Sequence, residues 1–482
     1  MISHAIPLSV TLLTHNRLHF LREAVDSVLA QRFGDFELLI LDNHSTDGTA
    51  DYCVSLTDPR VRYVRNPPDM DVEFNFASAL RLARGALRCL FHDDDVMEPE
   101  MLARQMAFIE DHPEVWALWC NRIHINTRGE VVSTPLHSGE DRLFAPGEYI
   151  RTFLAERLWP VQSGVMFRPI PQKDAQTILA LHYFYTRQAK RARQEDYPGS
   201  GDVLCMAEFN AKHAVACLGT PLLRYRIHDE QETRGIDTEK PLIFLYSRLK
   251  PLVRKAPGAQ DLAVVCEAGV LRYRAQRLLT QTRASTPRLR QSFLRLWRNF
   301  AARPELPPAA LRLALPVALA AHMLGEASAL EQVLSIFPEG EKTEADKATR
   351  ALLAWARRRA AGEMPLAALR GRRVILFGSV FVAALLLLEA QAEGVALLAC
   401  VDSNRTRQGG LLLGVPVHSV VWLASPEAAQ ADTLILTPEQ AHENIMCDLA
   451  QRQGCALEIL SWKTLVTAEA GQKKERPKTL ER

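Results

Sequence analysis

A chain of 482 residues is long enough for about three domains of ordinary size. With 48% hydrophobic and 24% charged residues, its composition is that of a globular protein rather than a disordered or fibrous one. The formal net charge is only +2, so the total charge argues against nucleic acid or a strongly acidic macromolecule as the partner.

The nine cysteines are scattered without a CxxC pair, which predicts buried thiols in a reducing compartment and no cysteine-bound metal. The N-terminus lacks the basic-then-apolar pattern of a signal peptide, and no segment reaches the ~20 apolar residues that a membrane span needs. The longest apolar run, residues 380–388, predicts a buried helix instead. We expect a cytoplasmic protein, and both oligomerisation and attachment to the inner face of a membrane are compatible with the sequence.

Short apolar stretches alternate with helical patterns through the N-terminal region. The apolar stretches, which predict strands, cover residues 8–13, 36–41, 61–64 and 86–91. This alternation predicts a parallel α/β sheet, and such sheets bind ligands at the carboxyl ends of their strands. The polar clusters of the region follow strand ends, at residues 14–17, 42–49 and 92–95.

Three adjacent carboxylates, Asp93, Asp94 and Asp95, come directly after the last of these strands. Such charges repel one another unless a cation or hydrogen-bond donors neutralise them, and Mg²⁺ or Mn²⁺ is the natural occupant. The alternative is a solvated acidic turn before a helix opened by Pro99, where negative charge is favourable.

Several motifs of this region occur together in one known family. They are residues 9–17, the loop 42–49, Asn75, Gly85 and residues 92–99. In their order and spacing, the chain resembles the family 2 inverting glycosyltransferases with the GT-A fold, over about residues 6–230. The resemblance implies transfer of a hexosyl or related group, with inversion, from a nucleotide-diphosphate sugar to the hydroxyl of a saccharide or lipid-linked acceptor. It also implies Mg²⁺ or Mn²⁺ as cofactor.

On the nucleoside side, the resemblance assigns roles to residues at the first two strand ends. Thr14 and Asn16 on the first turn are expected to meet the base and ribose. Asp42 is expected to accept hydrogen bonds from the nucleoside, although aspartate is also common where a chain turns. Residues 45–47 are expected to cap the next helix.

The family's acidic pair is spaced Asp-x-Asp, and two registers fit this sequence. One uses His92 with Asp94, and the other uses Asp93 with Asp95. We favour the second, with Asp93 and Asp94 on the nucleotide sugar and Asp95 on the metal ion, which stabilises the charge of the leaving group.

An inverting transfer needs a base that removes the proton of the attacking hydroxyl. In the family, an acidic residue at the start of a helix has this role, which makes Asp202 the candidate. An N-cap aspartate would occupy the same place, and Gly201 stands where the family often has an acid. Glu195 and Asp196 are reserve candidates.

The first domain is expected to close with Tyr225-Arg226-Ile227-His228, which resembles the ending of many of these enzymes. His228 is predicted to bind the metal ion or the diphosphate, and Arg226 to pair with phosphate. A histidine satisfied by the protein itself is the alternative.

The rest of the chain changes character twice. Residues 238–367 lose the strand patterns, and apolar residues recur at three- and four-residue spacing, which predicts a helical connector. Residues 368–467 resemble a Rossmann-like domain, in which Gly378 and Asp402 would contact a nucleotide. Val380 and Ala383 replace glycines of the dinucleotide fingerprint, so a degenerate domain used for packing, assembly or regulation is favoured.

The sequence therefore predicts an α/β protein of four parts. They are a GT-A nucleotide-diphospho-sugar transferase domain at 1–237, the helical connector at 238–367, a Rossmann-like α/β domain at 368–467 and a disordered tail at 468–482. The alternative function is that of a degenerate glycosyltransferase-like scaffold or a nucleotide-sensing protein.

Overall fold

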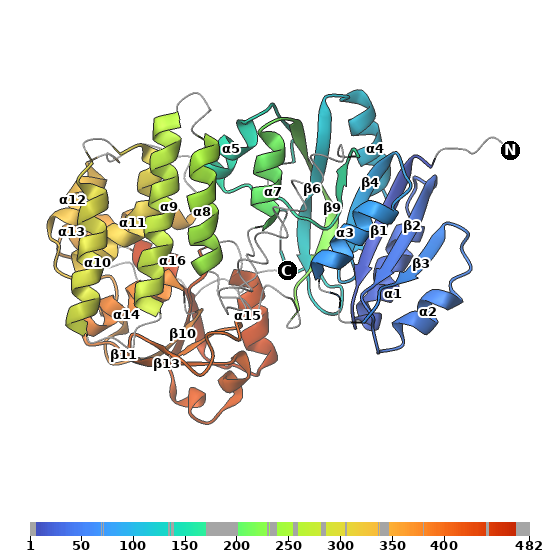
Figure 1. Ribbon diagram of the computed structural model, residues 1–482. Coiled ribbons are helices and arrows are strands. Elements are labelled where there is room, and N and C mark those ends of the chain that lie inside the picture. Colours follow the sequence, from blue (N-terminus) through green and yellow to red (C-terminus); the bar gives the residue numbers. More distant parts are fainter. Residues whose placement is uncertain are drawn as a thin grey trace. The chain divides into compact units, whose positions relative to one another are not determined.

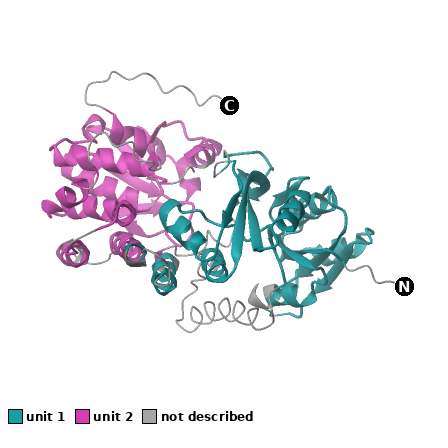
Figure 2. Ribbon diagram, turned by 90° about the horizontal axis from the view of Figure 1, so that it is seen from above, with its two compact units in different colours: residues 1–233, 240–263 teal, residues 234–239, 264–482 magenta. Residues whose placement is uncertain are grey.

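The computed structural model describes part of the chain and divides it into two compact units. Described are residues 6–468 except 69, 71, 134, 136–138, 170–200, 229–230, 232–238, 254–258, 281–285, 304–305, 336, 338–346, 379 and 440–442. Unit 1 comprises residues 1–233 and 240–263, and unit 2 comprises residues 234–239 and 264–482 (Figure 2). The units thus share the stretch expected to form one connector, and the four-part boundaries stay a prediction.

Unit 1 is built around a nine-stranded sheet with the order β3-β2-β1-β4-β8-β6-β9-β5, and β7 pairs with β9 (Figure 1). Its strands are β1 (Leu8–Thr14), β2 (Phe36–Asp42), β3 (Val61–Arg65), β4 (Leu87–His92), β5 (Val96–Met97), β6 (Val115–Ile125), β7 (Arg142–Phe144), β8 (Val165–Phe167) and β9 (Ala214–Arg226). Its described helices are α1 (Leu18–Leu29), α2 (Thr49–Ser55), α3 (Val72–Leu82), α4 (Met101–Asp111), α5 (Glu148–Glu156), α7 (Gly201–Asn210) and, from residue 240, α8 (Glu239–Val253). Strands β1 to β4 are parallel, which confirms the predicted N-terminal sheet.

The central strands are held in register by an apolar core and by one set of hydrogen bonds among Ser9, Glu37 and Gly85. All residues of β2 and all but one of β1 are buried. Gly85, just before β4, has to be glycine because a Cβ there would lie 2.3 Å from the backbone nitrogen of Ser9. The amide of Gly85 donates to Ser9 Oγ at 2.6 Å, and Ser9 Oγ donates to Glu37 Oε1 at 2.5 Å. These hydrogen bonds join β1, β2 and the start of β4, and so help to fix where the carboxyl ends of these strands lie.

Unit 2 combines helices with a six-stranded sheet of order β12-β13-β11-β10-β14-β15. Its strands are β10 (Arg373–Phe377), β11 (Ala396–Val401), β12 (Leu411–Leu412), β13 (Val415–His418), β14 (Thr433–Leu436) and β15 (Glu458–Ser461). Its helices are α9 (Ala259–Thr280, from residue 264), α10 (Thr286–Ala301), α11 (Pro308–Met323), α12 (Ser328–Leu334), α13 (Lys347–Ala360), α14 (Phe381–Glu393), α15 (Glu443–Arg452) and α16 (Trp462–Thr467).

All strands of this second sheet except β12 pair in parallel, which is the predicted Rossmann-like arrangement. Helix α14 follows the first strand and is almost wholly buried, so the apolar run at 380–388 is a core helix as expected. Within the described residues, every helix is too short or too polar to cross a bilayer.

Candidate active site

The parallel register of unit 1 brings several strand ends to one edge of the sheet. Thr14 pairs with Asp42 across β1 and β2, and Leu13 pairs with His92 across β1 and β4. After the acidic turn, β5 runs antiparallel to β9, with Val96 opposite Arg224. The residues that follow β9 therefore return to the acidic turn that follows β4.

Asp93 faces the turn after β1. Its Oδ2 accepts a hydrogen bond from the backbone of His15 at 3.3 Å, and its Oδ1 lies 3.3 Å from Arg17 Nη1. Burial and the charge of Asp94 raise the pKa of Asp93 to about 7, although Arg17 opposes the shift. Near neutral pH, this carboxyl therefore exchanges readily between its two protonation states.

Asp94 is the best compensated of the three acids. Its Oδ2 lies 3.1 Å from His228 Nε2 and 3.1 Å from Arg17 Nη1. Burial works to raise its pKa, but the hydrogen bond with His228 and the charges of His92 and Arg17 hold that pKa below its usual value. Asp94 is thus an anion in the folded protein.

Asp95 is the most deeply buried, with 1% of its surface exposed. Its Oδ1 accepts from the backbone amide of Arg226 at 2.9 Å. Its buried Oδ2 has no partner of normal hydrogen-bond geometry within the described part of the chain, although the side chain of Ser163 is close enough to lower the pKa of Asp95. Burial and the charge of Asp94 raise the pKa of Asp95 well above the ordinary value. An unsatisfied carboxylate oxygen in such a place is suited to a cation.

One ligand atom from each of His92, Asp94 and Asp95 can be chosen so that all three lie within 4.8 Å of one another. Carboxylate oxygens and imidazole nitrogen are suitable ligands for a divalent ion, and the orphaned Asp95 Oδ2 is one of them, so these residues fit a divalent metal. Asp93 lies outside this group of three. His228 supports the group by its hydrogen bond with Asp94. The structure therefore groups His92 with Asp94, which is the register that we did not favour from the sequence. Asp95 joins them.

Arg226 fixes the backbone of the acidic turn. Its side chain is 1% exposed, and it donates to the carbonyl of Asp94 at 2.8 Å and to that of Asn126 at 2.9 Å. It also pairs with Glu23. The guanidinium that was expected to meet phosphate thus has a structural task, which the sequence pattern did not reveal.

Asp42 and Asn16 order the loops where the sequence predicts the nucleoside to bind. Asp42 is fully buried and accepts from Tyr63 Oη at 2.7 Å and from the amide of Ser45 at 2.8 Å. Asn16 has a positive φ of 53° and accepts from the amide of Thr46 at 2.7 Å, so it ties the two loops together. Thr14, also expected here, is buried at the end of β1.

Asp202 lies in the first turn of α7 and lines a pocket of about 100 Å³. The other walls are mostly apolar and come from α3, α7, the sheet and the loop before β8: Leu80, Leu90, Ala117, Pro160, Val161, Gln162, Val165, Phe167, Cys205, Met206 and Phe209. The reserve candidates Glu195 and Asp196 lie outside the described residues.

Arg122 and Tyr225, to which the sequence assigned no role, are affected by the charges of both the acidic turn and Asp202. Arg122 is held by a bulge of β6, and its guanidinium lies 5.7 Å from the ring centre of Tyr225. Burial lowers the pKa of Arg122, and the charges of Asp95 and Asp202 both counteract this. Both carboxylates also raise the pKa of Tyr225, after burial and together with Asp94. Asp95 and Asp202 therefore act on the same pair of neighbours.

Residues 9–167, which contain the acidic turn, match the profile of Glycosyl transferase family 2. The resemblance to this family is thus confirmed for residues 9–167. The match ends before Asp202 and His228, so it covers the ends of β1 and β2 and the acidic turn.

Two curated proteins match part of the chain at about 30% identity. Protein CgeD of Bacillus subtilis is 33% identical over 135 residues, which are 26% of this chain and 32% of CgeD. Abequosyltransferase RfbV of Salmonella typhimurium is 30% identical over 127 residues, 25% of this chain and 36% of RfbV. The chain thus spans about a third of the length of these relatives. Among solved structures, S. aureus TarS 1–349 in complex with UDP-GlcNAc aligns with a TM-score of 0.42 and 16% identity, over 74% of this chain and 92% of TarS 1–349.

Outside the glycosyltransferase domain, the two expected nucleotide contacts of unit 2 are engaged by the protein itself. Asp402 accepts from the amide of Asn404 at 2.8 Å and lies 3.4 Å from Arg407 Nη1. Gly378 has a φ of 105°, and a Cβ there would lie 2.4 Å from Thr437 Oγ1. Glycine is therefore required here for packing against Thr437, whether or not a ligand binds.

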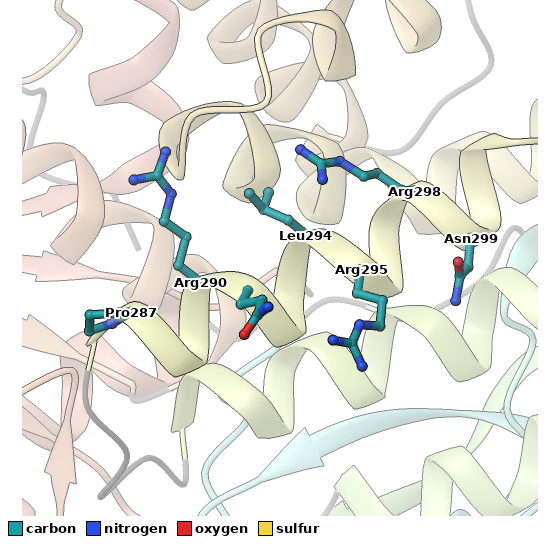
Figure 3. A pocket seen from close by; sticks show the side chains of 7 residues that line it. Pro287, Arg290, Leu294, Arg295, Arg298 and Asn299 are labelled. Carbon is teal, nitrogen blue, oxygen red and sulfur yellow. The ribbon is translucent and has the colours of Figure 1, made fainter.

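A larger hollow of about 570 Å³ lies on α10 of unit 2 (Figure 3). Arg290 and Arg298 extend from one side of this helix and Arg295 from another. Arg298 pairs with Glu326 at 2.6 Å. The hollow contains none of the predicted site residues, so its size does not identify a catalytic centre.

Proposed function

We propose that unit 1 transfers a sugar from a nucleotide diphosphate to a hydroxyl of a saccharide or lipid-linked acceptor. The observation that carries this proposal is the meeting of Asp93, Asp94 and Asp95 with His92 and His228 at one sheet edge. A nucleotide diphosphate brings two adjacent phosphates, and an acidic site can bind them only with the help of cations.

The residues that would hold Mg²⁺ or Mn²⁺ are Asp94 and Asp95 with His92. A divalent ion there supplies charge stabilisation for the departing diphosphate. His228 supports the set by fixing Asp94, and Arg226 fixes the backbone of the acidic turn.

The nucleoside is assigned to the neighbouring strand ends. Asp93 faces the turn after β1 and is assigned to the ribose. Asn16 and Asp42 order the loops that would surround the base, and Thr14 lies between them at the end of β1. Their contribution is to order these loops before the donor binds, which lowers the entropy cost of binding.

The base is assigned to Asp202. In an inverting transfer, the acceptor oxygen attacks the anomeric carbon from the face opposite the diphosphate, and its proton passes to the base. The charges of Asp202 and Asp95 both act on Arg122 and Tyr225, which supports a place for Asp202 near the acidic turn. The apolar walls around Asp202 would limit access of water and so disfavour hydrolysis of the donor.

Calorimetric titration of UDP, GDP, CDP and dTDP into the full chain tests the proposal. We expect one of them to bind in Mn²⁺ and not in EDTA. Asp95→Asn should weaken that binding at least about tenfold, because it removes a charged ligand. Asp51→Asn, at an exposed carboxylate of α2, is the matched control and should bind like wild type. Binding that ignores Mn²⁺ would reject the metal assignment, and absence of binding by all four would favour the scaffold alternative.

A further inference from the structure

Arg17 lies between the acidic turn and the nucleoside side. It is the N-cap residue of α1, and its backbone carbonyl accepts from the amides of Phe20 and Leu21 at 3.0 and 2.9 Å. Its side chain is 24% exposed, whereas those of Asp93 and Asp94, which it bridges, are 4% and 11% exposed. The backbone of Arg17 is thus fixed, while its guanidinium lies at the solvent side of the buried carboxylates.

The contact between Arg17 and Asp94 conflicts with a metal ion. Arg17 Nη1 and His228 Nε2 both lie 3.1 Å from the same atom, Asp94 Oδ2. Asp94 is also one of the three residues grouped to hold a divalent ion. Two cations near one carboxylate repel each other, so a divalent ion at Asp94 weakens the hold of Arg17 on it.

We propose that Arg17 is the exchangeable counter-ion of this site and turns from Asp93 and Asp94 to the donor diphosphate when metal and donor bind. This inference rests on the proposed function. A guanidinium is suited to the exchange because its planar fork bonds carboxylate and phosphate oxygens alike. The long side chain can turn while the start of α1 stays in place.

The exchange makes Arg17 act in opposite directions on the two ligands. Without donor, Arg17 competes with the metal ion for Asp94, so it lowers the affinity for the metal. With donor present, it adds a charged contact to the diphosphate, so it raises the affinity for the donor. Metal and donor then bind cooperatively. The donor draws Arg17 away from Asp94, which favours the metal ion, and the metal ion releases Arg17 to contact the donor.

Arg17→Gln tests the exchange with two titrations, Mn²⁺ alone and then the nucleoside diphosphate that wild type binds in Mn²⁺. We expect Mn²⁺ alone to bind about three- to tenfold more tightly, because a competing cation is gone. The diphosphate should bind about ten- to 100-fold more weakly, since a charged hydrogen bond is lost. Arg22→Gln is the matched control, because Arg22 is on the same helix but stacks on Tyr52 at 4.3 Å, and both affinities should stay as in wild type.

Arg17→Lys covers the case in which the glutamine variant fails to fold. Lysine keeps the charge but not the fork, so Mn²⁺ alone should bind as in wild type while diphosphate binding still weakens. If both affinities fall together in a folded Arg17→Gln variant, Arg17 only supports the fold, and if neither changes, it is no diphosphate ligand. Either result overturns the inference. Failure of wild type to bind any of the four diphosphates would instead reject the proposed function.

Discussion

Substituting Asp93 by asparagine should make the metal-free protein more stable at alkaline pH. The folded protein raises the pKa of this carboxyl from 3.8 to about 7, so folding favours its protonated form. Because the native state binds more protons than the unfolded state, this group lowers stability progressively as pH rises from about 3.8 to about 7. One pKa unit corresponds to about 1.4 kcal/mol, so the cost is about 4 kcal/mol at pH 8 and about 2 kcal/mol at pH 5.

Asparagine resembles the protonated acid in shape and cannot ionise, so Asp93→Asn should recover this stability. For a unit of this size, the melting temperature should rise by roughly 8–16 °C at pH 8 in EDTA and about half as much at pH 5. Thermal melts of the full chain, followed by circular dichroism, measure the change. Asp51→Asn removes an exposed charge from the first turn of α2 and should lower the melting temperature by no more than a few degrees at either pH. A variant that is less stable at pH 8, or equally affected at pH 3 and pH 8, would refute the electrostatic account of the acidic turn.

Three further predictions concern other parts of the molecule. Gly85→Ala should cost at least about 2 kcal/mol of stability, measured by denaturant unfolding, because its Cβ would meet the backbone of Ser9. Asp202→Asn should lower the transfer rate by about 10²–10⁴-fold while the diphosphate affinity stays unchanged, and an unchanged rate would remove Asp202 from the mechanism. Titration of the full chain should give one diphosphate per chain, and Asp402→Asn should leave that stoichiometry and affinity unaltered, because Asp402 is engaged by Arg407.

The fold of unit 1 was predictable because its signals are local. Apolar strands ending in polar turns predicted β1 to β4, and the structure confirms their parallel order. The long strand β6 was harder, because Asn121 and Arg122 interrupt the apolar pattern. The structure accommodates them at shifts of register, where Asn121 Nδ2 donates to the carbonyl of Gly219 at 2.9 Å. Such a bulge depends on the partner strand, and so no local pattern reveals it.

The acidic site was predictable in composition but not in grouping. Three consecutive carboxylates pointed to a cation, and the structure places His228 against one of them, Asp94. Which carboxylate faces which neighbour depends on the turn after β4 and on Arg226, whose backbone and side chain hold that turn from β9. Arg17 and Arg122 were missed for the same reason, since their partners lie far away in sequence.

The nucleotide site predicted in unit 2 shows that the spacing of residues along the chain is not enough to predict binding. Gly378 and Asp402 stand at the ends of β10 and β11, where a doubly wound sheet offers a nucleotide site. Spacing along the chain predicts where these two residues lie, but it does not reveal which distant side chains contact them. Here Arg407 lies between Asp402 and Glu239, 3.4 Å from one carboxylate and 3.0 Å from the other. A ribose hydroxyl would have to compete for a buried carboxylate that already has a charged partner and an amide donor. The Rossmann-like arrangement in unit 2 therefore does not imply a Rossmann ligand, because binding depends on the partners of Asp402 rather than on its position.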